Sequence, residues 1–179
     1  MKYLRFEPLL LLGLIWCVFI ANGLLPIELR HFGIRPRDLM GLVGIVFSPL
    51  LHSGWQHILA NSLPLLVLAS LLRLQGKKTF WQVTVFIVLL GGFLVWVLSG
   101  AGIVVGASGL IFGYWSFLLT HGFMTQSLKS IAIAIVVLLL YGTLFFSLFS
   151  FAPQVSWIAH AAGALAGCLA AIYLKPSSR

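Results

Sequence analysis

The feature that most constrains this chain is a run of 50 residues, from Thr79 to Leu128, that contains no Asp, Glu, Lys or Arg. Over the whole chain 61% of the residues are hydrophobic and 8% are charged, and the mean hydropathy is +1.11. Soluble globular proteins carry about 25% charged residues, so this composition does not supply the surface of a soluble fold. The sequence therefore predicts an integral membrane protein.

Six apolar blocks reach or approach the length of about 20 residues that a helix needs to cross a bilayer. They lie at about residues 8–25, 54–74, 80–99, 108–124, 129–150 and 155–174. Each block is apolar on every side, which is typical of membrane helices, whereas the strands of a membrane barrel alternate in polarity. The sequence predicts an all-α bundle of six transmembrane helices that forms a single domain over residues 1–179.

The basic residues are distributed unequally between the two sides of this predicted bundle. Both termini and the connections after the second and fourth helices carry eight of them, whereas the opposite side carries three. Because basic residues accumulate in the cytoplasm, both termini are expected to be cytoplasmic. The eight are Lys2, Arg5, Arg73, Lys77, Lys78, Lys129, Lys175 and Arg179, and the three are Arg30, Arg35 and Arg37.

The net charge of +8 is thus mainly a topology signal. Nucleic-acid binding would need a basic face on a soluble fold, so no nucleic-acid partner is expected. The one long connection, residues 26–50, mixes prolines and charges with apolar residues such as Leu39, Met40 and Phe47. This composition predicts a first loop associated with the outer membrane interface.

A serine lies at the start of the fourth predicted helix, in the step Gly106-Ala107-Ser108-Gly109. The uncharged connection before it, residues 99–107, is expected to dip into the protein, because irregular backbone at membrane depth must be buried or face a cavity. Free N–H groups and the helix dipole would stabilise a negative oxygen beside Ser108. A serine hydroxyl needs a base to become a nucleophile, and His160 in the last helix is the candidate.

Small-residue spacing predicts that the serine and histidine helices pack closely. Gly109 and Gly113 form one GxxxG pair, and Gly163 and Gly167 form another. Such pairs let helix backbones approach each other in membranes. His160 lies three and seven residues before the second pair, hence on the same helix face. If the two faces pack, the serine and histidine side chains enter one interface.

A third group of polar residues, His52, His57 and Asn61, lies around the start of the second helix. His57 and Asn61 are four residues apart, so they share a helix face, and both can donate hydrogen bonds to a substrate oxygen. A metal site made of His52, His57 and His160 is the weaker alternative, because metalloprotease helices use His-Glu-x-x-His and no carboxylate is near. No metal is therefore expected.

Acidic residues are absent from Leu39 to Arg179. Paired carboxylates therefore cannot be the reactive groups, and a proton-coupled transporter, which normally carries membrane carboxylates, is disfavoured. A Ser-His-Asp triad would be available only if Asp38 folded in from the first loop. A Ser-His dyad is what remains.

These motifs together resemble the rhomboid family of intramembrane serine proteases. The resemblance rests on His57-x-x-x-Asn61, Gly106-Ala107-Ser108-Gly109 and His160-x-x-Gly163-x-x-x-Gly167, in that order on the expected helices. It implies Ser108 as nucleophile, His160 as general base and acid, and His57 and Asn61 as the oxyanion-stabilising donors, with a structural role for His52. It implies no cofactor, and as partners it implies single-pass transmembrane substrates within the lipid bilayer.

Four positions depart from the better-known members of that family. A Trp-Arg pair that is common in the first loop is replaced by Val43-Gly44, and a glutamate near the end of the second helix is replaced by Arg73. A tyrosine that often packs on the histidine is Phe112 here, which can still stack. The resemblance therefore carries over the chemistry, but neither the geometry of the first loop nor a substrate preference.

Two other classes of protein remain as alternatives. One is a catalytically silent rhomboid-like protein that binds transmembrane clients, although such proteins usually lack the serine or the histidine. The other is a channel or transporter core in which the glycine faces serve only packing and Ser108 is inert. The expected location is the plasma membrane of a bacterium or archaeon, and the sequence leaves the oligomeric state open.

Overall fold

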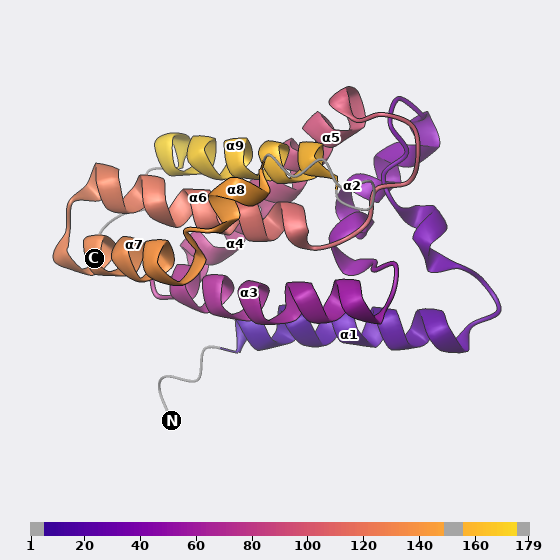
Figure 1. The fold of residues 1–179 in the computed structure, drawn as a ribbon, viewed down its shortest axis with the longest axis horizontal. Helices are drawn as coiled ribbons and strands as arrows, with labels where there is room; N and C mark the ends of the chain where they lie inside the picture. The colour runs from indigo at the N-terminus through magenta and orange to yellow at the C-terminus, as the bar shows by residue number, and fades with distance from the viewer. Residues whose placement is uncertain (1–5, 149–155, 175–179) are drawn as a thin grey trace.

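The computed structural model describes residues 6–148 and 156–174, and within these ranges the chain is helical, with one isolated β-bridge and no strand. The long helices lie alongside one another as a bundle (Figure 1). They are α1 (Glu7–Leu24), α3 (Trp55–Arg73), α4 (Lys77–Phe86) with its continuation α5 (Gly92–Leu98), α6 (Ser108–Thr125), α7 (Leu128–Tyr141) and α9 (Trp157–Tyr173). The predicted all-α class is confirmed.

The centre of the bundle is α6, which packs against α9, α7 and α3. Nine consecutive residues of this helix, from Leu110 to Leu118, are buried on all sides. A helix enclosed by other helices presents no face to lipid, so it can carry polar groups that pair within the protein. The hydroxyls of Tyr114 and Thr84 lie 2.7 Å apart, and Ser116 Oγ donates to the carbonyl of Ala164 at 2.7 Å.

Three helices in the described part of the chain are long and apolar enough to cross a membrane: Glu7–Leu24, Trp55–Arg73 and Lys77–Leu98. The apolar helices α7 and α9 are shorter. The predicted spans 8–25, 54–74, 80–99 and 108–124 agree with observed helix boundaries to within three residues. The count of six crossings stays a prediction.

The predicted span 129–150 is not one continuous helix in its described part. The helix α7 ends at Tyr141, and a short helix, α8 (Leu144–Ser147), follows a turn at Gly142 and Thr143. The N–H groups of Phe145 and Phe146 donate to carbonyls three residues back, which tightens the chain there. Glycine and threonine are poor helix formers, so the break falls at these two residues. Positions 149–150 and 155 of the predicted spans lie outside the described residues.

A π-helical turn, Ile87–Gly91, joins α4 to α5 and faces the two glycine-bearing helices. The Ile87 side chain occupies the notch left by Gly113, where a Cβ would come within 2.8 Å of its Cδ1. Gly91 lies against the backbone of α9 at Ala162 and Gly163. The extra residue of a π turn changes which residues of a helix share one face. Here Ile87 and Gly91 both face the pair α6 and α9, Ile87 at Gly113 and Gly91 at Ala162 and Gly163.

The first loop forms short helical turns, at Leu29–Phe32, Leu39–Val43, Gly44–Phe47 (α2) and Ser48–Leu50, which lie at one end of the bundle (Figure 1). Leu39 and Met40 are 78% and 75% exposed, as expected of a loop that contacts membrane. Arg37 fastens this loop to the end of α5, because its guanidinium donates to the carbonyls of Val97 (3.2 Å) and Ser99 (2.7 Å). The loop and the connection that leads to Ser108 are thus held as one unit.

The opposite end of the bundle carries those of the predicted cytoplasmic charges for which contacts are described: Arg73, Lys77 and Lys129. Arg73 donates to the Glu7 carboxylate at 2.8 Å and so joins the end of α3 to the start of α1. Lys129 donates to the carbonyl of Leu74 across the same end. The described start of α1 and the described end of α9 also lie there (Figure 1).

Candidate active site

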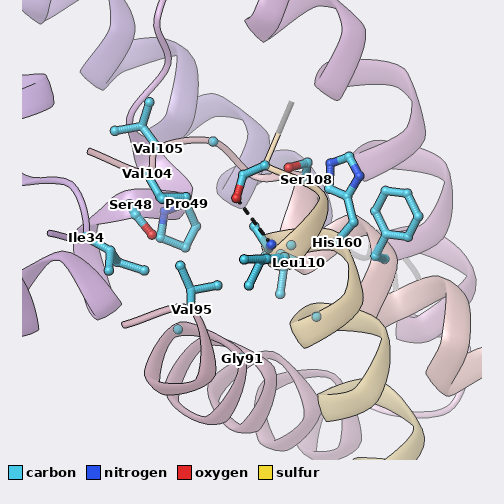
Figure 2. A pocket seen from close by; sticks show the side chains of 18 of the residues that line it. Ile34, Ser48, Pro49, Gly91, Val95, Val104, Val105, Ser108, Leu110 and His160 are labelled. Atoms are coloured by element: carbon cyan, nitrogen blue, oxygen red, sulfur yellow. Dashed lines mark hydrogen bonds between the residues drawn. The ribbon is translucent and has the colours of Figure 1, made fainter. Parts of the chain in front are cut away.

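A cavity of about 680 Å³ is lined in part by the first loop, which lies at one end of the bundle. Its walls come from the first loop, α3, the π turn and α5, the 99–107 connection, α6, α8 and α9. Figure 2 labels lining residues of the first loop, the π turn, α5, the connection, α6 and α9. The sequence-predicted residues Ser108, His160, His57 and Asn61 all line it. Tertiary structure has therefore gathered polar groups from segments separated by more than a hundred residues into one space.

Ser108 is the first residue of α6, as the sequence predicts. The connection before it is pinned to the first loop at two places. Val104 and Ile34 exchange backbone hydrogen bonds of 2.9 and 3.0 Å, and the Gly106 N–H donates to the carbonyl of Ser48 at 2.9 Å. Residues 100–103 of the connection are exposed, but Ala107 is fully buried, so the chain enters the protein just before the serine.

The glycine faces of α6 and α9 pack directly against each other. A Cβ on Gly163 would overlap the carbonyl of Gly109, and a Cβ on Gly167 would overlap the carbonyl of Gly113. Only residues without side chains permit this separation, which is the physical use of the two GxxxG pairs. The spacing in the sequence therefore predicted the correct pair of helices and the correct faces.

This packing brings Ser108 and His160 to the same wall of the cavity. A Cβ on Gly109, which follows the serine, would lie 3.3 Å from the carbonyl of Ala159, which precedes the histidine. Figure 2 accordingly shows the two side chains beside each other. Phe112 stacks on the His160 ring with a centroid separation of 4.2 Å and an interplanar angle of 17°, so the aromatic replacement keeps the stacking contact.

The orientation of His160 follows from a backbone group of α8. His160 Nδ1 lies 3.5 Å from the carbonyl oxygen of Ser147, and a carbonyl can only accept. Nδ1 therefore carries the proton, and Nε2 keeps a free lone pair that can accept one. Sequence reasoning missed Ser147, because a backbone carbonyl leaves no signal in residue type.

His57 has the opposite tautomer. Its Nδ1 lies 3.5 Å from the backbone N of Ser53, and an N–H group can only donate, so Nδ1 is the acceptor and Nε2 carries the proton. Nε2 and Cε1 lie against Gly106, where a Cβ would approach both to 2.6 Å. Gly106 has φ +121°, a conformation that favours glycine, so this residue serves both the backbone turn and the ring.

Asn61 is buried one turn after His57 on the same face of α3. Its Nδ2 donates to the His57 carbonyl at 2.9 Å, which fixes the amide orientation. An amide nitrogen has two N–H groups, so a second donor remains for the cavity.

His52 packs behind His57 rather than lining the cavity. It is 3% exposed, its ring lies edge-on to the His57 ring at 5.0 Å, and neither of its nitrogens has a hydrogen-bond partner. Burial, with a smaller contribution from His57, lowers the pKa of His52 from 6.5 to about 4, so it is neutral at physiological pH. The described residues contain no cluster of three His, Cys, Asp or Glu side chains that could hold a metal.

Asp38 does not enter the cavity to complete a triad. Its carboxylate accepts from the backbone N–H of Met40 at 2.9 Å and lies 3.7 Å from Arg35, at the start of a 3₁₀ turn in the first loop. Its side chain is 44% exposed. The charge that would orient the histidine in a triad is therefore replaced by the neutral Ser147 carbonyl.

Residues 40–177 match the family model of the Rhomboid domain, which covers most of the chain. The chain belongs to the rhomboid family. Two uncharacterized proteins, one from Mycobacterium tuberculosis and one from Mycobacterium bovis, are each 39% identical to this rhomboid over 176 residues, which cover 93% of this chain and 73% of theirs. An uncharacterized protein of Mycobacterium leprae is 35% identical over 177 residues, or 94% of this chain and 70% of its own. This rhomboid is therefore a membrane protein with bacterial relatives.

Proposed function

We propose that this rhomboid is an intramembrane serine endopeptidase that uses a Ser108–His160 dyad. The observation that carries the proposal is the contact of His160 Nδ1 with the Ser147 carbonyl oxygen at 3.5 Å. The Nδ1–H of His160 donates to the Ser147 carbonyl, so the lone pair of Nε2 is left for the serine proton at the wall where Ser108 begins α6. A histidine placed only for packing would need neither this orientation nor a serine beside it.

In the proposed reaction, Ser108 Oγ attacks a substrate carbonyl while His160 Nε2 accepts its proton. No hydrogen bond joins these two side chains in the described structure; catalytic hydrogen bonds often tighten only when substrate binds. The Ser147 carbonyl stabilises the imidazolium that forms, in the position that an aspartate occupies in a triad.

The negative oxygen of the tetrahedral intermediate needs donors on the other side of the cavity. His57 Nε2–H and the second N–H of Asn61 are available there, and the Ser108 N–H lies at the N-terminus of α6, where the helix dipole is positive. Protonated His160 then gives its proton to the leaving amine, and a water molecule that enters the cavity hydrolyses the acyl-enzyme. Each step uses groups of this chain and no cofactor.

The proposed substrates are transmembrane segments of single-pass proteins, cut near the outer surface of a bacterial plasma membrane. The supporting observation is the position of the cavity beside the apolar first loop, at the end opposite the Glu7–Arg73 ion pair and Lys129. Because basic residues favour the cytoplasm, this arrangement supports cytoplasmic termini and a cavity that faces outward.

The test is cleavage of a single-span substrate by purified protein in liposomes, with Ser108→Ala and His160→Ala as variants. Both variants should lose cleavage while retaining the wild-type unfolding temperature, and a fluorophosphonate probe should label only protein that contains Ser108. Cleavage that survives Ser108→Ala would reject the nucleophile. A wild-type protein that neither cleaves nor reacts with the probe would support the catalytically silent, client-binding alternative.

A further inference from the structure

A hydroxyl that the proposed reaction does not use lies beside His57. Ser53 is an exposed residue at the rim of the cavity, two positions before the first residue of α3. Its Oγ lies 3.0 Å, and its backbone N 3.5 Å, from His57 Nδ1. We infer that Ser53 is a positioning residue for His57, which holds Nδ1 as an acceptor and thereby directs Nε2–H at the substrate oxygen.

The argument starts from the chemistry of neutral imidazole, which has one donor nitrogen and one acceptor nitrogen. In the other tautomer, Nδ1–H would confront the Ser53 N–H, and the Nε2 lone pair would face the developing negative oxygen. That arrangement would repel the intermediate that the site is proposed to stabilise. The Ser53 N–H therefore selects the form that donates into the cavity, and the Ser53 hydroxyl, which can donate or accept, adds a second hydrogen bond to Nδ1 in that form.

The surroundings of the ring leave this selection to Ser53. Among the hydrogen bonds of the described residues, Ser53 supplies both partners of His57 Nδ1. The His52 ring lies edge-on at 5.0 Å and the backbone of Gly106 lies against Nε2 and Cε1, and neither makes a hydrogen bond to Nδ1 among the described residues. Without the Ser53 hydroxyl, the longer 3.5 Å contact of the Ser53 N–H alone would hold Nδ1 as an acceptor.

The inference also explains how two histidines in one cavity acquire opposite roles. His160 donates from Nδ1 to a carbonyl and keeps a basic Nε2, whereas His57 accepts at Nδ1 and keeps a protonated Nε2. The difference lies outside the rings, in the groups of Ser147 and Ser53 that each Nδ1 meets. The inference rests on the proposed function, since it concerns how His57 serves that reaction.

The test compares Ser53→Ala with Ser53→Thr, which keeps the hydroxyl, and with Ser70→Ala, the same change at an exposed serine more than three turns further along α3. Loss of one hydrogen bond that orients a donor should lower kcat about five- to tenfold and leave KM unchanged. Ser53→Thr should recover most of kcat, and Ser70→Ala should match wild type. All three should unfold at the wild-type temperature.

Nitrogen NMR of protein labelled at histidine reads the tautomer directly, with His57→Asn used to assign the signals. Wild-type His57 should show a protonated Nε2 and an unprotonated Nδ1, and Ser53→Ala, which keeps the backbone N–H, should keep this tautomer but shift the Nδ1 signal because one of its two hydrogen bonds is lost. Wild-type protonation at Nδ1, or a Ser53→Ala variant with unchanged kcat, overturns the inference. The NMR measurement does not depend on cleavage, so it tests the role of Ser53 separately from the proposed function. Failure of the proposed function would appear instead as absence of fluorophosphonate labelling at Ser108.

Discussion

Replacement of Gly163 by alanine should separate α6 from α9 and lower the proposed activity about a hundredfold without unfolding the protein. A Cβ at Gly163 would lie 2.7 Å from the carbonyl carbon of Gly109 and 2.9 Å from its Cα. Carbon atoms reach optimal van der Waals contact at about 3.5–4.0 Å, so the helices must move apart by about 1 Å. Ser108 and His160 lie on the two helices that separate.

Two magnitudes follow from this displacement. A misplacement of about 1 Å between reacting groups costs about a hundredfold in rate. Overpacking of a tight interface costs about 1–3 kcal/mol of stability, which a folded helical bundle tolerates. The activity should therefore fall much further than the unfolding temperature.

The assay measures substrate cleavage and fluorophosphonate labelling beside thermal unfolding in detergent. Gly13→Ala is the matched control, because a Cβ there meets no atom within 4 Å. Gly109→Ala is an intermediate case, since its Cβ would meet only the Ala159 backbone, at 3.3 Å from the carbonyl oxygen. Wild-type activity and unfolding temperature in Gly163→Ala would refute the claim that this contact sets the distance between the two side chains.

Three further predictions concern the cavity and its supports. Gly106→Ala should abolish cleavage, because its Cβ would lie 2.6 Å from the His57 ring. The control Gly102→Ala has a similar φ of +114° and no atom within 4 Å of its Cβ, so it should share the backbone strain and keep most of the activity. Equal losses of cleavage in the two variants would contradict this prediction. Phe112→Leu removes the ring stacked at 4.2 Å on the proposed base, so kcat should fall about tenfold with a smaller change for Phe112→Tyr, as measured in the same assay. The pKa of His52 is about 4 in the folded protein and 6.5 in the unfolded chain, so the unfolded chain binds the proton first as the pH falls. The free energy of unfolding should therefore be highest above pH 6.5 and should fall by on the order of 3 kcal/mol as the pH drops toward 4. Unfolding free energies from pH 4 to 8 should depend less on pH in His52→Phe, and identical pH profiles would disprove this.

Several parts of the structure could be predicted because their signals are local. The span boundaries follow from the length of apolar runs, since lipid cannot satisfy an open backbone and so enforces helices. The start of α6 at Ser108 follows from the glycine-rich connection before it. The α6–α9 pairing follows from two GxxxG pairs, because only glycine permits such close backbones.

Other features could not be read from the sequence, because they depend on backbone groups or on which loops meet. The break between α7 and α8 places the Ser147 carbonyl beside His160, yet a carbonyl is present at every residue. The sequence could not exclude Asp38 as the third member of a triad, because the path of the first loop was unknown. In the structure its carboxylate lies in a turn of that loop. The hydrogen bonds of Arg37 to the carbonyls of Val97 and Ser99 could not be predicted either, because these acceptors lie far away in the sequence, at the end of α5.

The sequence by itself determined that the chain is a membrane-embedded helical bundle, and it identified the serine, histidines and asparagine that line the cavity, because residue type and spacing encode hydrophobicity, helix faces and chemistry. Only the tertiary structure decided what each histidine can do. A histidine side chain is the same molecule at positions 57 and 160, and the groups that its Nδ1 meets, an N–H in one case and a carbonyl in the other, decide whether the ring donates or accepts in the cavity.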